Sequence, residues 1–202
     1  EVAEFVRHHS CERRFRLEYD DRKKAKELPF AERLFNPIDP VLQAKGGERE
    51  KEWRETLKDE GLEDITGAYE TEYDQETQTD TNNDRTETTW EEFKEEVREL
   101  NPGDTAFARE VKVEGKIGVF DVSGKIDFLL VLWDGANPYL RAVETKASRR
   151  DKTYQRIQVA IYKLLLEQNL SEEPLQPNRG VVNPQHIECV VGRTDDSTNR
   201  IQ

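Results

Sequence analysis

Three ionisable residues in the second half of the chain could together support hydrolytic chemistry. Asp127 lies inside the most apolar segment, residues 126–133, where an ionised carboxylate is costly unless it is paired or binds a metal. Glu144 and Lys146 are two residues apart, so in a β-strand they point to the same face. Two carboxylates with room for water suit Mg²⁺, which lowers the pKa of bound water and neutralises charge on a phosphoryl oxygen. A neighbouring lysine can orient that water or stabilise the developing charge.

A plainer interpretation gives these residues only structural roles. Asp127 could pair with Lys125 or Lys146, and Glu144 could be a solvated strand residue. Taken singly, each motif favours this interpretation. The combination of a strand with an embedded Asp, a turn, and a strand that ends in Glu-x-Lys favours a metal-dependent site.

The elements that must position these residues form a predicted three-strand meander. Alternating apolar residues over 107–122 predict a hairpin with turns at Glu114-Gly115 and Ser123-Gly124. The almost continuous apolar run 126–133 predicts a strand buried on both faces, and residues 139–146 form the next strand after a turn.

Helices flank this meander in the predicted fold. Helical periodicity and capping residues predict four helices and one last strand. The helices cover residues 1–20, about 40–60, 90–100 and 151–170, and the strand covers residues 187–191. The Gly46-Gly47 pair indicates either that the second helix begins after it or that close packing requires small residues there. This order of elements predicts an α/β fold with a mixed sheet.

Length and composition limit the class of protein. The 202 residues suffice for one domain and are too few for two ordinary ones. The chain has no run of 18 apolar residues and no signal-peptide core, so we expect a cytoplasmic protein without a membrane segment. Methionine is absent and no closing element ends the chain, so we expect a segment of a longer polypeptide. Two cysteines, Cys11 and Cys189, exclude a disulfide scaffold and a four-cysteine metal site.

The net charge of −12 is unevenly distributed. Residues 48–100 hold 20 Asp/Glu and 7 Lys/Arg, so the remainder is close to neutral. Residues 7–26 and 141–163 are locally basic. The bulk charge argues against a nucleic-acid partner, yet a partner responds to the local field. Ordinary solvated helix faces are the alternative explanation.

The acidic charge defines the expected organisation of the single domain. Residues 70–89 contain no aliphatic side chain and cannot bury enough apolar surface to offset their ordering entropy. We therefore expect a helical N-terminal part (1–69), an acidic flexible insertion (70–89) and a catalytic core (90–202).

Three segments in order resemble the PD-(D/E)XK nuclease superfamily, specifically its RecB-like branch, which includes CRISPR-associated and helicase-linked nucleases. The segments are Gly124-Lys125-Ile126-Asp127, Ala142-Val143-Glu144-Thr145-Lys146-Ala147-Ser148 and Gln158-Val159-Ala160-Ile161-Tyr162. Weaker similarity extends to residues 10–19 and to Gly46-Gly47-Glu48-Arg49-Glu50. In the last segment Glu50 stands where the family has a histidine ligand, and Glu48 is the competing candidate.

The resemblance implies a restriction-endonuclease-like core, a central mixed β-sheet flanked by helices, and a role for each matching residue. Asp127 and Glu144 would bind a divalent metal, Mg²⁺ or Mn²⁺, together with the backbone carbonyl of Thr145 and the side chain of Glu50. Lys146 would act on the attacking water. Gln158 and Tyr162 would support these catalytic residues or contact the DNA backbone; an ordinary helix face is the alternative for both.

The same resemblance implies a DNA substrate. Cations that follow the catalytic strand could bind phosphates: Arg149, Arg150, Lys152 and Arg156. No segment reads as a major-groove recognition helix, so we expect single strands, ends or flaps to be cleaved with low sequence specificity. A helicase or another domain of the same longer chain could be a further partner, and we expect no membrane. Iron–sulfur members use one early and three late cysteines; only Cys189 follows Cys11, so no cluster is expected within this segment.

Two other functions remain open from the sequence. The chain could be a catalytically silent module that keeps the nuclease fold and binds DNA or a partner. The motif could also be a coincidence in an acidic interaction domain.

Overall fold

A computed structural model gives the structure of the protein, and it describes residues 2, 40–66, 87–146, 153–178 and 180–193. Apart from Val2, the predicted helix over residues 1–20 lies outside these ranges, as do residues 70–86 of the predicted insertion and the cations Arg149, Arg150 and Lys152. Within the described part of the chain, no helix combines the length and apolar character needed to cross a membrane.

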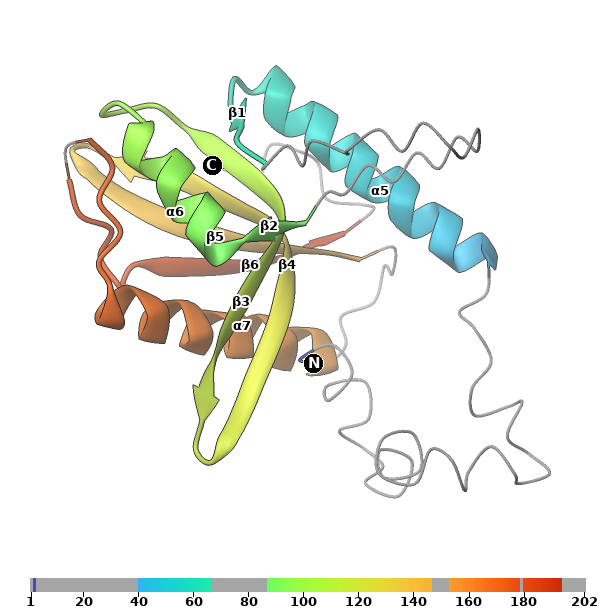
Figure 1. Cartoon of the computed structure of the whole chain (residues 1–202). Coiled ribbons are helices and arrows are strands. Elements are labelled where there is room, and N and C mark those ends of the chain that lie inside the picture. Colours follow the sequence, from blue (N-terminus) through green and yellow to red (C-terminus); the bar gives the residue numbers. More distant parts are fainter. Residues whose placement is uncertain (1, 3–39, 67–86, 147–152, 179, 194–202) are drawn as a thin grey trace, which may run out of the picture.

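The centre of the molecule is a curled mixed sheet, which confirms the predicted α/β fold (Figure 1). Its strands are β1 (Glu63–Asp64), β2 (Thr88–Thr89), β3 (Ala106–Ile117), β4 (Phe120–Asp134), β5 (Asn137–Lys146) and β6 (Ile187–Arg193). Strands β3, β4 and β5 form the predicted antiparallel meander, and β6 pairs with β5 in parallel. The two short strands β1 and β2 both pair in parallel with β3.

Helices cover both faces of this sheet. They are α5 (Pro40–Asp59), α6 (Trp90–Glu99) and α7 (Thr153–Glu172). Apolar residues of α6 and α7 pack with β3, β4 and β5 in one large core, called here the α7-side core. On the other face, Trp53 and Leu57 of α5 pack on Phe107, Phe128 and Val143 in a smaller core, the α5-side core.

Helix α6 begins where the sequence predicts. Thr89 caps it: the Thr89 hydroxyl accepts from the backbone N–H of Glu92, and the Glu92 carboxylate accepts from the backbone N–H of Thr89. Thr88 and Thr89, assigned to the acidic insertion, instead form strand β2.

Helix α5 runs straight through Gly46 and Gly47, so the prediction that it could begin after this pair is wrong. Close packing against the described residues does not explain the glycines either, because a Cβ atom added at either position would meet none of their atoms within 4 Å. Gly61, at a φ of 86°, follows the end of this helix, which lies close to the predicted boundary at residue 60.

Both turns predicted within residues 107–125 are wrong. Glu114 pairs with Ser123 inside a continuous ladder, and the chain reverses instead around Gly118, at a φ of 62°. The glycines at 115 and 124 serve close packing on α7 rather than turns. A Cβ atom at Gly115 would lie 2.5 Å from Gln168 Oε1, and one at Gly124 would lie 2.6 Å from Tyr162 Cε1.

The β3–β4 ladder is interrupted at one point, where Glu110 and Asp127 occupy opposing positions without forming a ladder pair. Glu110 has a φ of 50°, in the left-handed region that non-glycine residues rarely adopt. The flanking pairs, Arg109–Phe128 and Val111–Ile126, keep the same register.

This interruption changes which residues face each core. Ala108 and Val111 are three residues apart on β3, yet both lie in the α7-side core. Leu129 and Ile126 are likewise three residues apart on β4, and both lie in the α7-side core. Because side chains of a regular strand alternate between faces, each strand holds one extra residue at this point. The irregularity therefore lets the side chains of both Glu110 and Asp127 reach the α5 side of the sheet, where they line one pocket.

Candidate active site

Asp127 joins strands β4 and β5 at the place where they diverge. Their backbone ladder ends at the pair Phe128–Val143. Beyond it, the carboxylate Oδ2 of Asp127 accepts hydrogen bonds from the backbone N–H of Thr145 at 2.6 Å and from its hydroxyl at 2.8 Å. The Asp127 carboxylate thus accepts the hydrogen bond from the Thr145 N–H that a backbone carbonyl would accept in a continued ladder. This bond fixes Asp127 beside the end of β5.

Glu144 lies next to this junction with only 2% of its surface exposed. Its Oε1 accepts hydrogen bonds from Lys146 Nζ and, at 2.7 Å, from Gln158 Nε2. Its other oxygen, Oε2, is buried, and no described residue forms a hydrogen bond with it. A buried carboxylate oxygen without a partner is costly, so this atom is suited to a ligand that supplies positive charge.

Helix α7 supports Glu144 from behind through two side chains one turn apart. Gln158 Nε2 donates to the Tyr162 hydroxyl at 2.9 Å, and this hydroxyl donates to the backbone carbonyl of Lys125 at 2.6 Å. Both side chains are buried, so they do not belong to a solvated helix face. The chain of bonds connects α7 to β5 at Glu144 and to β4 at Lys125.

The charges of Asp127, Glu144 and Lys146 act on one another. Burial, and next the charge of Asp127, raise the pKa of Glu144 to about 8. Burial also raises the pKa of Asp127, against the opposing effects of Lys146 and the Thr145 bonds. Burial disfavours the charged form of Lys146, but the carboxylates of Glu144 and Asp127 outweigh it and raise the pKa of this amine. Lys146 therefore stays protonated, and it lies beside two carboxyl groups, Asp127 and Glu144, whose pKa values are raised.

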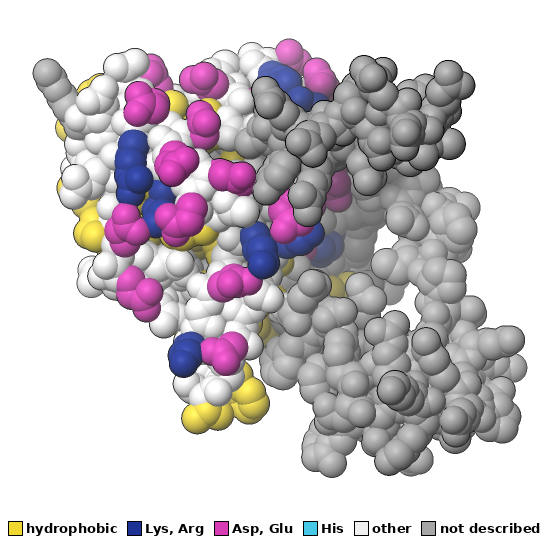
Figure 2. Space-filling model, viewed as in Figure 1, with side chains coloured by type: hydrophobic (Ala, Val, Ile, Leu, Met, Phe, Trp, Pro, Cys, Tyr) yellow, Lys and Arg dark blue, Asp and Glu magenta, His cyan; other side chains and the backbone are white. Residues whose placement is uncertain are grey.

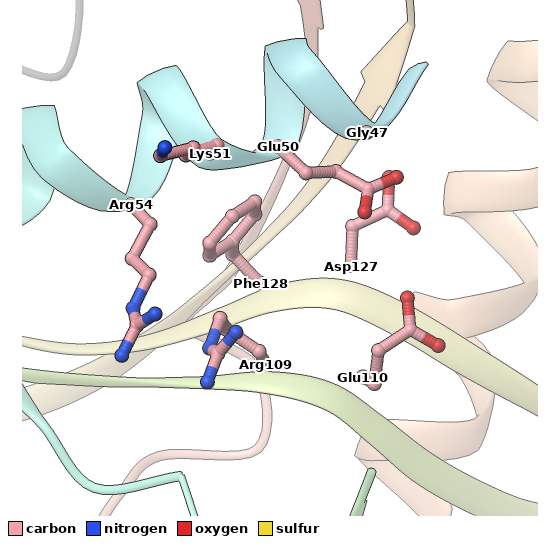
Figure 3. A pocket seen from close by; sticks show the side chains of 8 residues that line it. All are labelled: Gly47, Glu50, Lys51, Arg54, Arg109, Glu110, Asp127 and Phe128. Atoms are coloured by element: carbon pink, nitrogen blue, oxygen red, sulfur yellow. The ribbon is translucent and has the colours of Figure 1, made fainter. Parts of the chain in front are cut away.

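A pocket of about 160 Å³ opens beside Asp127, between α5 and the strands β3 and β4 (Figure 3). Figure 3 shows carboxylates gathered at one end of the pocket and cationic side chains at the other. The lining residues are Gly47, Glu50, Lys51, Arg54, Arg109, Glu110, Asp127 and Phe128.

Glu50 reaches this pocket from α5, and its carboxylate points toward that of Asp127 (Figure 3). Partial burial, and next the charge of Asp127, raise the pKa of Glu50. Glu48, the competing candidate, is exposed and does not line the pocket. The placement of the helix thus brings Glu50, and not Glu48, toward Asp127.

Glu110 is a fourth acidic residue of the site that the sequence analysis did not single out. Burial raises its pKa to about 7, with further contributions from Asp127 and Glu50. A signal for it exists in the sequence: Arg109 and Glu110 are consecutive polar residues directly before the alternating residues Val111, Lys112 and Val113. Two neighbouring polar residues in such a pattern indicate a bulge.

Comparison with known proteins identifies the family. A model of the PD-(D/E)XK nuclease superfamily matches residues 3–186. The chain belongs to the PD-(D/E)XK nuclease superfamily. Neither the search of curated proteins nor that of solved structures returned a match. Members of this superfamily are typically hydrolytic nucleases that use divalent metals, which indicates a metal-dependent nuclease.

The residues of this superfamily member offer the oxygen ligands that a hard divalent cation takes. Among the described residues, no three Asp, Glu, His or Cys side chains already lie in a metal-binding arrangement. The buried Oε2 of Glu144 nevertheless lacks a hydrogen-bond partner among these residues, and the Asp127 carboxylate lies beside a pocket that Glu50 also lines. Burial, and next the charge of Asp127, raise the pKa of both Glu144 and Glu50, and a cation stabilises the charged form of such neighbouring carboxylates, so the donor set fits Mg²⁺ or Mn²⁺.

The predicted DNA-binding cations are only partly described. Arg156 is exposed on α7, whereas Arg149, Arg150 and Lys152 lie outside the described residues. The structure instead brings three other cations, Lys51, Arg54 and Arg109, to the pocket beside Asp127. No spacing in the sequence connects these three, because α5 and β3 meet only in the folded chain.

Cys189 packs as a small hydrophobic residue. It is partly buried and packs against the α7-side core, and burial raises the pKa of its thiol to about 11. Cys11 lies outside the described residues.

Proposed function

We propose that this chain is a divalent-metal-dependent deoxyribonuclease of the RecB-like branch. The observation that carries the proposal is the contact of Lys146 with Glu144, a carboxylate that is buried and whose pKa the charge of Asp127 raises further. An acid from one strand and a Glu-x-Lys pair from the next thus meet at one point, and Gln158 and Tyr162 support this arrangement.

Three acidic side chains would hold the metal. Asp127, Glu144 and Glu50 supply carboxylate oxygens, and the backbone carbonyl of Thr145 is the fourth proposed ligand. A bound Mg²⁺ or Mn²⁺ supplies Lewis-acid activation of water and neutralises charge on the phosphate.

Lys146 acts on the attacking water. Its ammonium group is fixed by Glu144, so it can orient a water molecule and stabilise negative charge as that charge develops. Gln158 is a positioning residue, because it holds Glu144 through a hydrogen bond and is itself bonded to Tyr162. Preorganisation of this kind reduces the reorganisation that the reaction would otherwise require.

The substrate proposed is DNA in the form of single strands, ends or flaps. The pocket beside Asp127 is smaller than the 300–1,000 Å³ typical of sites for small molecules, so it suits a backbone phosphate better than a nucleobase. Contacts to phosphates carry no direct sequence information, which supports low sequence specificity.

The test is cleavage of labelled single-stranded and duplex DNA with Mg²⁺, Mn²⁺ or a chelator. We expect cleavage only with a metal, and Lys146→Ala should reduce its rate about 10²–10⁴-fold. Lys116→Ala is a matched control, because Lys116 is 71% exposed near the hairpin turn and does not line the pocket.

Two outcomes would overturn the proposal. Cleavage that survives Lys146→Ala would exclude this mechanism. DNA binding without cleavage under every metal would indicate a catalytically silent binding module.

A further inference from the structure

The cationic end of the pocket has no assigned role in the metal chemistry. We propose that Lys51, Arg54 and Arg109 form a subsite for a backbone phosphate next to the scissile one. This inference rests on the proposed nuclease function and names a substrate group that the same pocket would bind.

Helix α5 places acid and cation at opposite ends of one pocket. Gly47, Glu50, Lys51 and Arg54 are three or four residues apart, so they lie along one face of the helix. Glu50 and Arg54 are separated by about 6 Å along the helix axis. Figure 3 shows the carboxylate of Glu50 directed toward Asp127 and the guanidinium of Arg54 directed the other way. A DNA strand whose scissile phosphate is bound near the carboxylates would therefore extend past the cations.

Strand β3 adds Arg109 to the same end. Residues 109 and 110 are consecutive, so a regular strand would direct them to opposite faces. The positive φ of Glu110 interrupts this alternation, and both side chains line the pocket. The same irregularity thus gives the pocket an acid near Asp127 and a cation near Arg54.

A bridge of side chains orients both arginines. Asp64 Oδ2 accepts from Arg54 Nε at 3.0 Å, while Asp64 Oδ1 accepts from the Thr66 hydroxyl at 2.5 Å. The Thr66 Oγ1 in turn accepts from the backbone N–H of Arg109 at 3.1 Å and from its Nε at 3.4 Å. Two guanidinium groups that are already fixed lose less entropy when they bind a phosphate.

Among the described residues, cations outnumber carboxylates at this end of the pocket. Asp64 supplies one carboxylate, whose Oδ2 also lies 3.5 Å from Lys58 Nζ. Three cationic side chains line the pocket at this end: Lys51, Arg54 and Arg109. Guanidinium groups bind phosphate through paired, charge-assisted hydrogen bonds, so a phosphate is the ligand class that this end would recognise.

The competing explanation is that these cations only balance the neighbouring acids. A double-substitution cycle separates the two explanations. The probe is a short single-stranded DNA in which one phosphate at a time is replaced by a neutral methylphosphonate. Wild type, Arg109→Ala and Arg109→Lys are compared, and Arg98→Ala is the matched control because Arg98 is bonded to Glu173 away from the pocket.

We expect one methylphosphonate next to the scissile phosphate to raise KM about tenfold for the wild type, with little change in kcat. In Arg109→Ala the same replacement should have no further effect, and the salt slope of binding should fall by about one. Arg109→Lys should recover part of the methylphosphonate effect on KM that Arg109→Ala removes. Lys51→Ala should remove a smaller part of this effect, and Arg98→Ala should match wild type.

The inference is wrong if the methylphosphonate effect persists in Arg109→Ala, or if that variant loses activity equally on every probe. If the wild type cleaves DNA but either of these results is found, the subsite is rejected and the nuclease function stands. If the wild type does not cleave at all, the same cycle is measured on DNA affinity with Ca²⁺. If the methylphosphonate replacement and Arg109→Ala are coupled in their effects on DNA affinity, the subsite stands and the nuclease function is rejected. If they are not coupled, both are rejected.

Discussion

The two sides of the site differ in how deeply their polar groups are buried. On the α7 side, Glu144, Gln158 and Tyr162 are buried and form a continuous chain of hydrogen bonds that ends on a backbone carbonyl. On the α5 side, Glu50 and Asp127 line an open pocket. The α7 side is built to hold a carboxylate in place, and the α5 side is built to admit ligands.

This difference predicts different costs of substitution. A change on the α7 side removes a partner from a buried polar group and must reduce stability as well as function. A change on the α5 side alters groups that water can reach, so it should affect ligand binding with little effect on folding. Variants of matched chemistry on the two sides can test the distinction.

The same contrast appears at the periphery of the sheet. Beyond Ile117, the β3–β4 hairpin extends past the α7-side core, and Val119 and Phe120 near its turn are 89% and 71% exposed. Figure 2 shows apolar side chains at the tip of this hairpin, while acidic and basic side chains are mixed over the rest of the described face. The tightly bonded region is therefore confined to the part of the sheet that faces α7.

The largest effect is expected from Gln158→Leu on the α7 side. Glu144 Oε1 loses one of its two donors, and the Tyr162 hydroxyl loses the amide that donates to it. We expect the free energy of unfolding to fall by about 1–3 kcal/mol. Mn²⁺ affinity should fall about 10–100-fold, because Gln158 orients a proposed ligand. Urea unfolding and calorimetric titration with Mn²⁺ measure the two effects.

Gln168→Leu is the control on the same helix. Gln168 accepts a hydrogen bond from the backbone N–H of Lys116 and donates to Glu172, and within the described part of the chain it forms no hydrogen bond with a proposed metal ligand, so its loss should leave Mn²⁺ affinity unchanged. A Gln158→Leu variant that loses stability but keeps its metal affinity would show that the α7 side serves only folding.

A smaller and more selective effect is expected from Glu50→Gln on the α5 side. Removal of one proposed ligand should lower Mn²⁺ affinity about tenfold. The free energy of unfolding without metal should change by less than about 0.5 kcal/mol, because burial and Asp127 already disfavour the charged form of Glu50. The rise in melting temperature on addition of Mn²⁺ should shrink in parallel with the affinity.

Glu48→Gln is the matched control on the same helix, since Glu48 is exposed and outside the pocket lining. It should behave as wild type in both measurements. A loss of Mn²⁺ affinity in Glu48→Gln but not in Glu50→Gln would instead assign the ligand to Glu48.

Much of the architecture could be predicted from the sequence because its signals are local. The apolar run 126–133, the Glu144-Thr145-Lys146 segment and the capping residue Thr89 each define an element without reference to the rest of the chain. Glycine was misleading because it suits both a turn and a close contact. Gly115 and Gly124 resemble turn residues in sequence and meet α7 in the structure.

The acidic centre and the cationic end of the pocket differ in predictability for the same reason. Asp127 and Glu144 belong to neighbouring strands of a meander, so their proximity follows from chain order. Arg54 and Arg109 come from α5 and β3, and Asp64 and Thr66 link them across the parallel pairing of β1 with β3. Pairing between distant short segments has no local signal, so no pattern could predict this arrangement.

The smallest effect, and one opposite in sign on the two sides, is expected from adding a methyl group at a glycine. On the α7 side, a Cβ atom at Gly115 would lie 2.5 Å from Gln168 Oε1 and 3.0 Å from Leu165 Cδ2. Gln168 must move and lose its 2.9 Å hydrogen bond from the Lys116 N–H, while Leu165 is fully buried. Gly115→Ala should therefore destabilise the protein by about 1 kcal/mol.

On the α5 side, a Cβ atom at Gly46 meets nothing within 4 Å, and the residue lies inside a helix. Gly46→Ala should stabilise the protein by up to about 1 kcal/mol, because alanine loses less backbone entropy than glycine in a helix. Urea unfolding of both variants measures the two signs directly. If Gly115→Ala were as harmless as Gly46→Ala, then α7 would not be packed closely on the β3–β4 hairpin, and the rigid support proposed for Glu144 would lose its structural basis.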